Sequence, residues 1–224
     1  MNNDEAIPEL VAVVPALNEA GTIGNIVDSL RAYGDVVVVD DGSIDGTGNL
    51  ARSAGAFVVS HAVNQGYDQA LESGLLWAAA QGYRYGITLD ADGQHSVSSI
   101  ALFASELDAG ADLVVGIRDR KQRWAETLFS LIAKKLWNID DPLCGMKGYR
   151  LDLLRAKGRF DTYSSIGTEF CIRAARSGCV IHQIQVATLS RTGSSRFGGG
   201  LLPNLRIIRA IALGILRASP FSCI

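Results

Sequence analysis

Residues 36–43 have the sequence Val-Val-Val-Val-Asp-Asp-Gly-Ser, and this stretch indicates the fold of the chain. Four β-branched residues in a row, with no polar residue between them, are typical of a strand that is buried on both faces. The two aspartates and the glycine that follow predict a tight acidic turn at the carboxyl end of the strand. Fully buried strands occur mainly in parallel sheets that carry helices on both faces. Residues 36–43 therefore predict an α/β protein with polar side chains at one edge of its sheet.

Similar stretches lie on either side of residues 36–43 and alternate with helical patterns. Further apolar, strand-like runs occupy residues 10–14, 56–60, 85–89 and 113–116. Amphipathic patterns between them predict helices over residues 20–33, 45–54, 65–81 and 97–109. Strands that alternate with helices form a mostly parallel sheet covered on both faces. With 224 residues, of which 48% are hydrophobic, the chain is long enough to build one such domain.

Polar clusters follow three of the predicted strands at the point where each strand ends. Their sequences are Pro-Ala-Leu-Asn-Glu (residues 15–19), Asp-Asp-Gly-Ser (residues 40–43) and Asp-Ala-Asp-Gly-Gln (residues 90–94). In sheets of this kind, ligands bind at the carboxyl ends of the strands. Crowded carboxylates repel one another unless a cation or hydrogen-bond donors compensate their charge. We therefore expect a ligand site at this edge of the sheet.

Asp90 and Asp92 are candidates for a metal site. If the chain stays extended there, residues two apart point to the same side. Two hard oxygen ligands with room for phosphate oxygens suit a Mg²⁺ or Mn²⁺ ion shared with a nucleotide, and Gln94 could add a neutral ligand. Taken alone, these three residues are equally explained as a solvated acidic turn.

The charged residues are divided unevenly along the chain, although the formal net charge is only −2. Residues 170–224 contain seven arginines and no acidic residue. This asymmetry predicts an anionic partner for the C-terminal part, which is a phosphate group, a membrane surface or a nucleic acid. Because no aromatic platform for RNA accompanies the arginines, nucleic acid is the weakest of the three, and we expect no nucleic-acid partner.

The chain ends and the cysteines bear on where the protein works. Residues 1–9 are polar and acidic and lack the apolar core of a signal peptide. The longest apolar run near the C-terminus, residues 210–216, is much shorter than the roughly 20 residues that a membrane span needs. The four cysteines show no CxxC spacing, so we expect reduced thiols. These features predict a cytoplasmic protein.

Residues 201–216 form an amphipathic pattern when they are plotted as a helix. Four isoleucines share one face and three arginines lie opposite: Ile207, Ile208, Ile211 and Ile215 against Arg206, Arg209 and Arg217. This pattern is typical of a helix that lies in the surface of a membrane. An ordinary helix that packs on the core can show it too. The sequence therefore leaves open whether this helix contacts the cytoplasmic face of a membrane or packs on the core.

Several motifs occur in an order that resembles a known family. They are residues 15–19, the run Asp-Asp-Gly-Ser-Ile-Asp-Gly-Thr at 40–47, Asn-Gln-Gly at 64–66 and Asp-Ala-Asp-Gly-Gln-His at 90–95. In this order they resemble the family 2 glycosyltransferases, which have the Rossmann-like GT-A fold. Residues 113–118, 141–150 and 191–196 are similar to dolichyl- and polyprenyl-phosphate sugar synthases. The resemblance implies a GT-A catalytic domain over residues 1–200, followed by a C-terminal amphipathic helix and tail over 201–224.

The resemblance also implies roles for individual residues. It places the nucleotide sugar against Pro15, Leu17, Glu19, Val39, Asp41, Asp90, Ala91, Arg118, Arg191 and Arg196. It assigns the metal ion, Mg²⁺ or Mn²⁺, to Asp92 and Gln94. Arg123 and Thr127, four residues further along one helix, match the clamp for the acceptor phosphate. Asp92, Arg118 and Arg191 are then the catalytic residues, because they neutralise the leaving diphosphate.

The implied activity is metal-dependent, inverting transfer of a sugar from a nucleotide diphosphate sugar to a polyprenyl phosphate. A phosphate acceptor is already ionised near neutral pH and needs no general base, whereas a hydroxyl acceptor on a saccharide or lipid needs one. Candidates for such a base are Asp140, Asp141 and Glu169, each of which also suits a turn or the first turn of a helix. Further alternatives are a non-catalytic sugar-nucleotide-binding protein and a nucleotidyltransferase.

Overall fold

The computed structural model describes residues 9–91, 97–119, 121, 123–155, 167–187 and 201–217. The strands are β1 (Leu10–Ala16), β2 (Asp35–Asp40), β3 (Phe57–Ser60), β4 (Tyr85–Thr88), β5 (Leu113–Arg118), β6 (Lys147–Arg150) and β7 (Ile181–Val186). The helices are α1 (Ile23–Leu30), α2 (Thr47–Ser53), α3 (Tyr67–Ala80), α4 (Ser99–Asp108), α5 (Trp124–Trp137), α6 (Asp152–Arg155), α7 (Thr168–Arg176) and α8 (Leu201–Arg217).

The described strands form one sheet in the order β3-β2-β1-β4-β6-β5-β7. All neighbouring pairs are parallel except those of β6, which runs antiparallel to both β4 and β5. After β1 the chain adds β2 and β3 on one side and then crosses to place β4 on the other side of β1. Strand order therefore reverses at β1, and such switch points are where ligands bind in open α/β sheets. The predicted mostly parallel sheet is confirmed.

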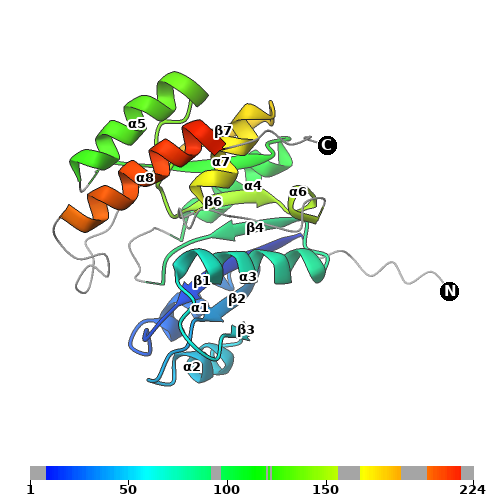
Figure 1. Ribbon diagram of the computed structural model, residues 1–224. Coiled ribbons are helices and arrows are strands. Elements are labelled where there is room, and N and C mark those ends of the chain that lie inside the picture. Colours follow the sequence, from blue (N-terminus) through cyan, green and yellow to red (C-terminus); the bar gives the residue numbers. More distant parts are fainter. Residues whose placement is uncertain are drawn as a thin grey trace.

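Helices cover both faces of the sheet and divide the apolar core into two layers (Figure 1). On one face, α1, α2 and α4 pack on side chains such as Val14 and Ile87. On the other face, α3, α5, α7 and α8 enclose a second layer that includes Val13 and Tyr149. Because alternate residues of β1 enter opposite layers, the continuous apolar run of this strand is explained by burial on both faces.

The predicted elements are present, but the predicted ends of β1, β2 and β5 came too early. β1 continues through Ala16 because it pairs with Asp40 of β2, and β5 continues to Arg118 because it pairs with Val186 of β7. Pairing partners rather than hydrophobicity set these ends. The sequence also gave no sign of β6, whose residues Lys-Gly-Tyr-Arg lack both an apolar run and clear alternation.

The isoleucines of α8 do not form one exposed face. Ile207 and Ile211 are buried in the core, whereas Ile208 and Ile215 are 39% and 42% exposed. The interpretation of all four as a single membrane face is therefore wrong. The reason is that α8 packs beside α5 and α7, and these helices cover its flank. Within the described residues, no helix is long and apolar enough to cross a membrane.

The cysteines differ in state. Cys144 and Cys171 are free and buried, while Cys179 is disulfide-bonded. The expectation that all cysteines are reduced is therefore wrong at Cys179. Spacing along the chain gave no warning, because disulfide formation depends on distance in the folded molecule rather than on separation in sequence.

Candidate functional site

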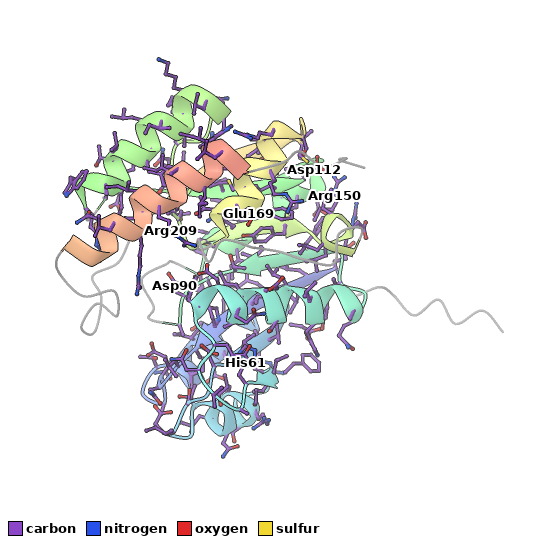
Figure 2. The ribbon with its side chains drawn as sticks, in the orientation of Figure 1. His61, Asp90, Asp112, Arg150, Glu169 and Arg209 are labelled. Atoms are coloured by element: carbon purple, nitrogen blue, oxygen red, sulfur yellow. The ribbon has the colours of Figure 1, made fainter. Side chains whose placement is uncertain are left out.

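The three polar clusters predicted at the ends of strands lie at the same edge of the sheet. They follow β1, β2 and β4, which are neighbours in the order β2-β1-β4. β5 ends at this edge with Arg118, and the turn that leads into the antiparallel strand β6 brings residues 141–146 there. Figure 2 shows Asp90 at this edge, whereas the ion pair between Asp112 and Arg150 lies toward the opposite edge. The described part of the candidate site is therefore assembled from five separate segments.

The loops after β1 and β2 are tied together by hydrogen bonds between backbone and side chains. The amide of Asn18 donates to Ser43 Oγ (2.9 Å), and Asn18 Oδ1 accepts from the amide of Ile44 (3.0 Å). The amide of Glu19 donates to Thr47 Oγ1 (2.8 Å). Asn18 has a φ of 53°, a left-handed conformation that asparagine tolerates better than most residues. The two loops thus form one rigid rim above the sheet.

Four residues predicted to contact the base and ribose lie at or below this rim. Pro15 and Val39 are paired in register on β1 and β2, and both are buried. Leu17 and Glu19 are partly exposed in the loop above them. Two of these residues are therefore buried in the strands, and the other two are partly exposed in the loop that follows β1.

Asp41 holds a neighbouring loop in place. Its carboxylate is almost fully buried and accepts hydrogen bonds from His61 Nδ1 (2.7 Å) and from the amides of Gln65 (2.8 Å) and Gly66 (2.9 Å). His61 in turn contacts Ser73 through Nε2 at 3.0 Å. A buried carboxylate is stable only when its charge is compensated in this way. The structure thus gives Asp41 a loop-holding role that its place in the motif did not reveal.

Asp90 is enclosed by two elements that sequence reasoning missed. The hydroxyl of Tyr67, in the first turn of α3, donates to Asp90 Oδ1 at 2.5 Å. Burial and the neighbouring Asp90 carboxylate raise the pKa of Tyr67 well above its usual value, so this phenol remains a donor. A Cβ added to Gly145 would lie 2.8 Å from Asp90 Oδ2, so only glycine lets the turn before β6 approach so closely. Ala91 is buried, and its carbonyl accepts from Thr22 Oγ1 at 3.2 Å.

We expect replacement of Tyr67 with phenylalanine to lower kcat/KM for the nucleotide sugar by about 10-fold, because a hydrogen bond to a charged group is worth about 1.5–3 kcal/mol. Steady-state kinetics with the donor varied measures this effect. Tyr83→Phe is the matched control, since Tyr83 donates to Asp35 Oδ2 (2.6 Å) at the start of β2, on the opposite edge. Equal kinetic losses in both variants would show that the Tyr67 hydroxyl only stabilises the fold.

Arg118 lies against a buried carboxylate. Its Nε and Nη2 donate to the two oxygens of Asp141 at 2.8 and 2.9 Å, and its backbone amide also donates to Asp141 (3.2 Å). Asp141 is 1% exposed. Burial alone would lower the pKa of the Arg118 guanidinium, but Asp141 outweighs it, so the net shift is upward and the charge is retained. The bidentate pair fixes the plane of the guanidinium at the end of β5.

Arg123 is not part of a helix. It precedes α5 with an extended backbone (φ −134°, ψ 146°), so the prediction that Arg123 and Thr127 share a helix is wrong. Arg123 is the N-cap of α5, and its carbonyl accepts from the amides of Glu126 (3.1 Å) and Thr127 (3.4 Å). Arg123 Nη1 instead donates to Glu126 Oε1 at 2.9 Å, and Thr127 is exposed on the first turn of α5.

The carboxylates proposed as a general base are all paired with cations. Asp141 binds Arg118, Glu169 lies 3.4 Å from Arg173, and Asp140 lies 2.6 Å from Lys134. Glu169 and Asp141 are also almost fully buried. The oxygens of these carboxylates are therefore engaged by cationic side chains rather than free to take a proton from a hydroxyl acceptor. This arrangement favours a structural role for these three residues.

Four of the predicted site residues lie outside the described residues, namely Asp92, Gln94, Arg191 and Arg196. Their roles stay predictions from the resemblance. Among the residues that the structure does describe, no three histidine, cysteine or acidic side chains come together as a metal site. Asp90, at the edge of the sheet, and the predicted ligands Asp92 and Gln94 supply oxygen donors, which is the ligand type that Mg²⁺ and Mn²⁺ prefer. The donor set therefore fits a hard divalent cation.

Comparison with known proteins extends these observations. Residues 11–155 match the sequence profile of glycosyl transferase family 2. The undecaprenyl-phosphate mannosyltransferase of Micrococcus luteus is 30% identical over 86% of this chain and 89% of its own. The polyprenol monophosphomannose synthase of Mycolicibacterium smegmatis is 27% identical over 84% and 81%, respectively. The dolichyl-phosphate hexose transferase of Haloferax volcanii is 28% identical over 90% and 93%.

A solved structure shares the fold. Glucosyl-3-phosphoglycerate synthase from Mycobacterium tuberculosis superposes with a TM-score of 0.73 at 24% identity, covering 97% of this chain and 83% of that one. The likeness confirms the predicted GT-A architecture. Because the family profile spans more than half of the residues and the relatives cover most of the sequence, the chain belongs to glycosyl transferase family 2 and is a nucleotide-sugar glycosyltransferase.

Proposed function

We propose that this enzyme transfers a sugar from a nucleotide diphosphate sugar to a polyprenyl phosphate, with inversion at the transferred carbon. The observation that carries the proposal is the pair Arg118 and Arg123, whose guanidinium groups both contact Glu126. Arg118 lies at the same edge of the sheet as the loops after β1, β2 and β4. Paired guanidinium groups are a common way to bind a phosphate monoester.

The relatives support this choice of acceptor. The three enzymes compared above carry names that specify undecaprenyl phosphate, polyprenol monophosphate and dolichyl phosphate. Each aligns over at least 84% of this chain, so the similarity includes the segment of Arg118 and Arg123. A lipid phosphate as acceptor therefore agrees with both the chemistry of the arginine pair and the names of the relatives.

Such a reaction needs no general base. An oxygen of the acceptor phosphate attacks C1 of the sugar, the bond from C1 to the donor phosphate breaks, and the nucleoside diphosphate leaves with the electron pair. In our proposal, Arg191 balances the charge that develops on the leaving group. Arg118, whose guanidinium group contacts Glu126 together with that of Arg123, binds the acceptor phosphate instead of the leaving diphosphate. The pairing of Asp140, Asp141 and Glu169 with cations agrees with a reaction in which no carboxylate takes a proton.

A divalent cation fits the proposed donor site. Asp92 and Gln94 would hold it, and Asp90 and Ala91 would contact the nucleotide sugar beside it. When bound, the ion would neutralise part of the diphosphate charge. Solved complexes of glucosyl-3-phosphoglycerate synthase contain Mn²⁺ or Mg²⁺ with uridine diphosphate, which agrees with this assignment. Those structures are under 25% identical, so the assignment stays a proposal for this chain.

The proposal is tested by incubating the enzyme with a panel of nucleotide sugars and Mn²⁺, with and without a short polyprenyl phosphate. Release of nucleoside diphosphate and appearance of a lipid-linked sugar are measured. We expect lipid-dependent release with one donor. The alternative acceptor is a hydroxyl on a saccharide or lipid. The alternative would be supported if release of nucleoside diphosphate required such a hydroxyl acceptor. In that case, release should be lost in Glu169→Gln but retained in Arg123→Ala.

We further propose that α5 and α8 together contact the cytoplasmic face of a membrane. The two helices lie side by side at the top of the molecule (Figure 1). On α5, Leu128 and Leu131 are 40% and 65% exposed, and on α8, Leu205 is 57% exposed. The two helices also carry further exposed apolar residues (Trp124, Ile208, Ile215 and Leu216) and exposed basic residues (Lys134, Lys135, Arg206 and Arg209). Apolar side chains flanked by cations suit an anionic bilayer surface.

We therefore expect the enzyme to sediment with vesicles that contain anionic lipid, and to bind less at high salt. Each basic residue near the surface contributes about 1 kcal/mol, and this contribution is screened by salt. Leu131→Asp combined with Leu205→Asp should weaken binding, whereas Leu102→Asp should not, since Leu102 is equally exposed on α4 over the other face of the sheet. Ile211 is unsuitable for this test because it is buried.

The vesicle experiment has a clear contrary outcome. If the wild-type enzyme stays in the supernatant at low salt, α5 and α8 pack on the core and do not contact a membrane. If the control and the double variant lose binding equally, the contact is not on α5 and α8. Both results are independent of which sugar or acceptor the enzyme uses.

A further inference from the structure

We propose that Glu126 is a positioning residue for the acceptor: its carboxylate holds Arg118 and Arg123 at a fixed spacing so that both guanidinium groups can bind one phosphate. This inference rests on the function proposed above. It assigns a role to a residue that neither the motifs nor the resemblance singled out. The argument depends on burial, on contact geometry and on the balance of charge around the two arginines.

Glu126 bridges the two arginines. Its Oε1 accepts from Arg123 Nη1 at 2.9 Å, and its Oε2 lies 3.4 Å from Arg118 Nη2. Arg118 is the last residue of β5 and Arg123 is the N-cap of α5, so they belong to two different elements. Glu126 stands in the first turn of α5 and connects both. One side chain thereby couples the strand to the helix.

Burial makes a purely stabilising role a poor explanation. The side chain of Glu126 is 4% exposed, and those of Arg118 and Arg123 are 16% and 19% exposed. Moving charges out of water costs about as much as their attraction returns, so buried ion pairs contribute little net stability. Charged side chains that are buried at the carboxyl edge of an α/β sheet are instead typical of binding sites. The position of Glu126 at this edge points to a use in binding.

The balance of charge indicates what Glu126 supplies. Arg118 and Arg123 contribute two positive charges, and Asp141 and Glu126 contribute two negative charges. This group therefore offers an incoming phosphate little net attraction over distance. It offers N–H donors whose directions are fixed in advance, and such preorganisation lowers the cost of binding. Geometry, more than charge, should then determine how well the acceptor binds.

The experiment compares Glu126→Gln with the wild-type enzyme. Glutamine has nearly the same shape but lacks the charge, so it holds two guanidinium groups less firmly. We expect the KM for polyprenyl phosphate to rise by about 10- to 100-fold, because small displacements of binding groups have effects of this size. The KM for the nucleotide sugar should change by less than about twofold. Glu106→Gln, which removes a carboxylate paired with His182 on α4 and β7, is the control and should change neither KM.

A double-mutant cycle separates positioning from general destabilisation. If Glu126 acts through Arg123, then Glu126→Gln should raise the acceptor KM by less than about threefold in an Arg123→Ala background. If the KM increase in the double variant equals the product of the increases in the two single variants, the proposal is overturned. An unchanged acceptor KM in Glu126→Gln, or equal increases in both KM values, would also overturn it. Thermal unfolding of each variant shows whether loss of structure accounts for the result.

The two proposals fail in distinguishable ways. If the wild-type enzyme does not use polyprenyl phosphate at all, the proposed function is wrong, and the role of Glu126 falls with it. If the wild-type enzyme uses polyprenyl phosphate and the Glu126→Gln variant matches it, only the role of Glu126 is wrong.

Discussion

Asp92→Ala is expected to lower the rate of sugar transfer by about 100- to 1000-fold, the loss seen when an electrostatic group at a reacting centre is removed. Asp92 directly follows Ala91, which is buried at the end of β4 and tied to Thr22. The prediction rests on the sequence pattern, since Asp92 itself lies outside the described residues. Without its carboxylate, the proposed cation loses one of two protein ligands, and the charge of the leaving diphosphate is less well balanced.

The measurement is the initial rate of nucleoside diphosphate release over a range of Mn²⁺ concentrations. Asp28→Ala is the control, because Asp28 is exposed on α1 and belongs to no polar cluster. Both variants should retain the unfolding temperature of the wild type. Wild-type turnover by Asp92→Ala in buffer treated with a chelator would refute the metal site.

Arg123→Ala is expected to raise the KM for polyprenyl phosphate by about 10- to 100-fold, because hydrogen bonds to a charged group contribute about 1.5–3 kcal/mol. The KM for the nucleotide sugar should change much less, since the donor loops follow β1, β2 and β4. The variant also leaves Glu126 without its partner at 2.9 Å, so part of the effect arises from a buried charge.

Two comparisons isolate the contribution of the guanidinium group. Arg123→Lys keeps the charge but not the planar fork, and it should recover only part of the acceptor affinity. Arg84→Ala removes an exposed arginine near the start of β4, at the opposite edge, and should leave both KM values unchanged. Equal increases in the KM for donor and acceptor in Arg123→Ala would count against a phosphate clamp at this position.

The core of the fold could be predicted from local patterns. Apolar runs such as residues 36–39 indicate strands that are buried on both faces. The amphipathic stretches between such runs indicate helices that cover a sheet. The polar clusters after three strands located the edge of the candidate site for the same reason, because parallel strands all end on one side. Hydrophobic periodicity is a property of neighbouring residues, so the sequence alone was sufficient to predict these elements, although not the last residue of each strand.

Other features depended on contacts between distant residues. Tyr67 and Asp90 are 23 positions apart, as are Arg118 and Asp141. β6 becomes a strand because β4 and β5 lie on either side of it, although its own sequence is neither apolar nor alternating. Half of the isoleucine face of α8 is buried because α5 and α7 pack beside it.

The sequence by itself therefore determined the α/β class, the edge of the sheet where the polar clusters meet and the family to which the motifs point. Tertiary structure alone decided which carboxylates are held by cations, that Glu126 joins Arg118 to Arg123, and which apolar residues of α5 and α8 face outward. The physical reason is that hydrophobic periodicity is encoded locally, whereas the pairing of buried charges and the covering of a helix face depend on the path of the whole chain.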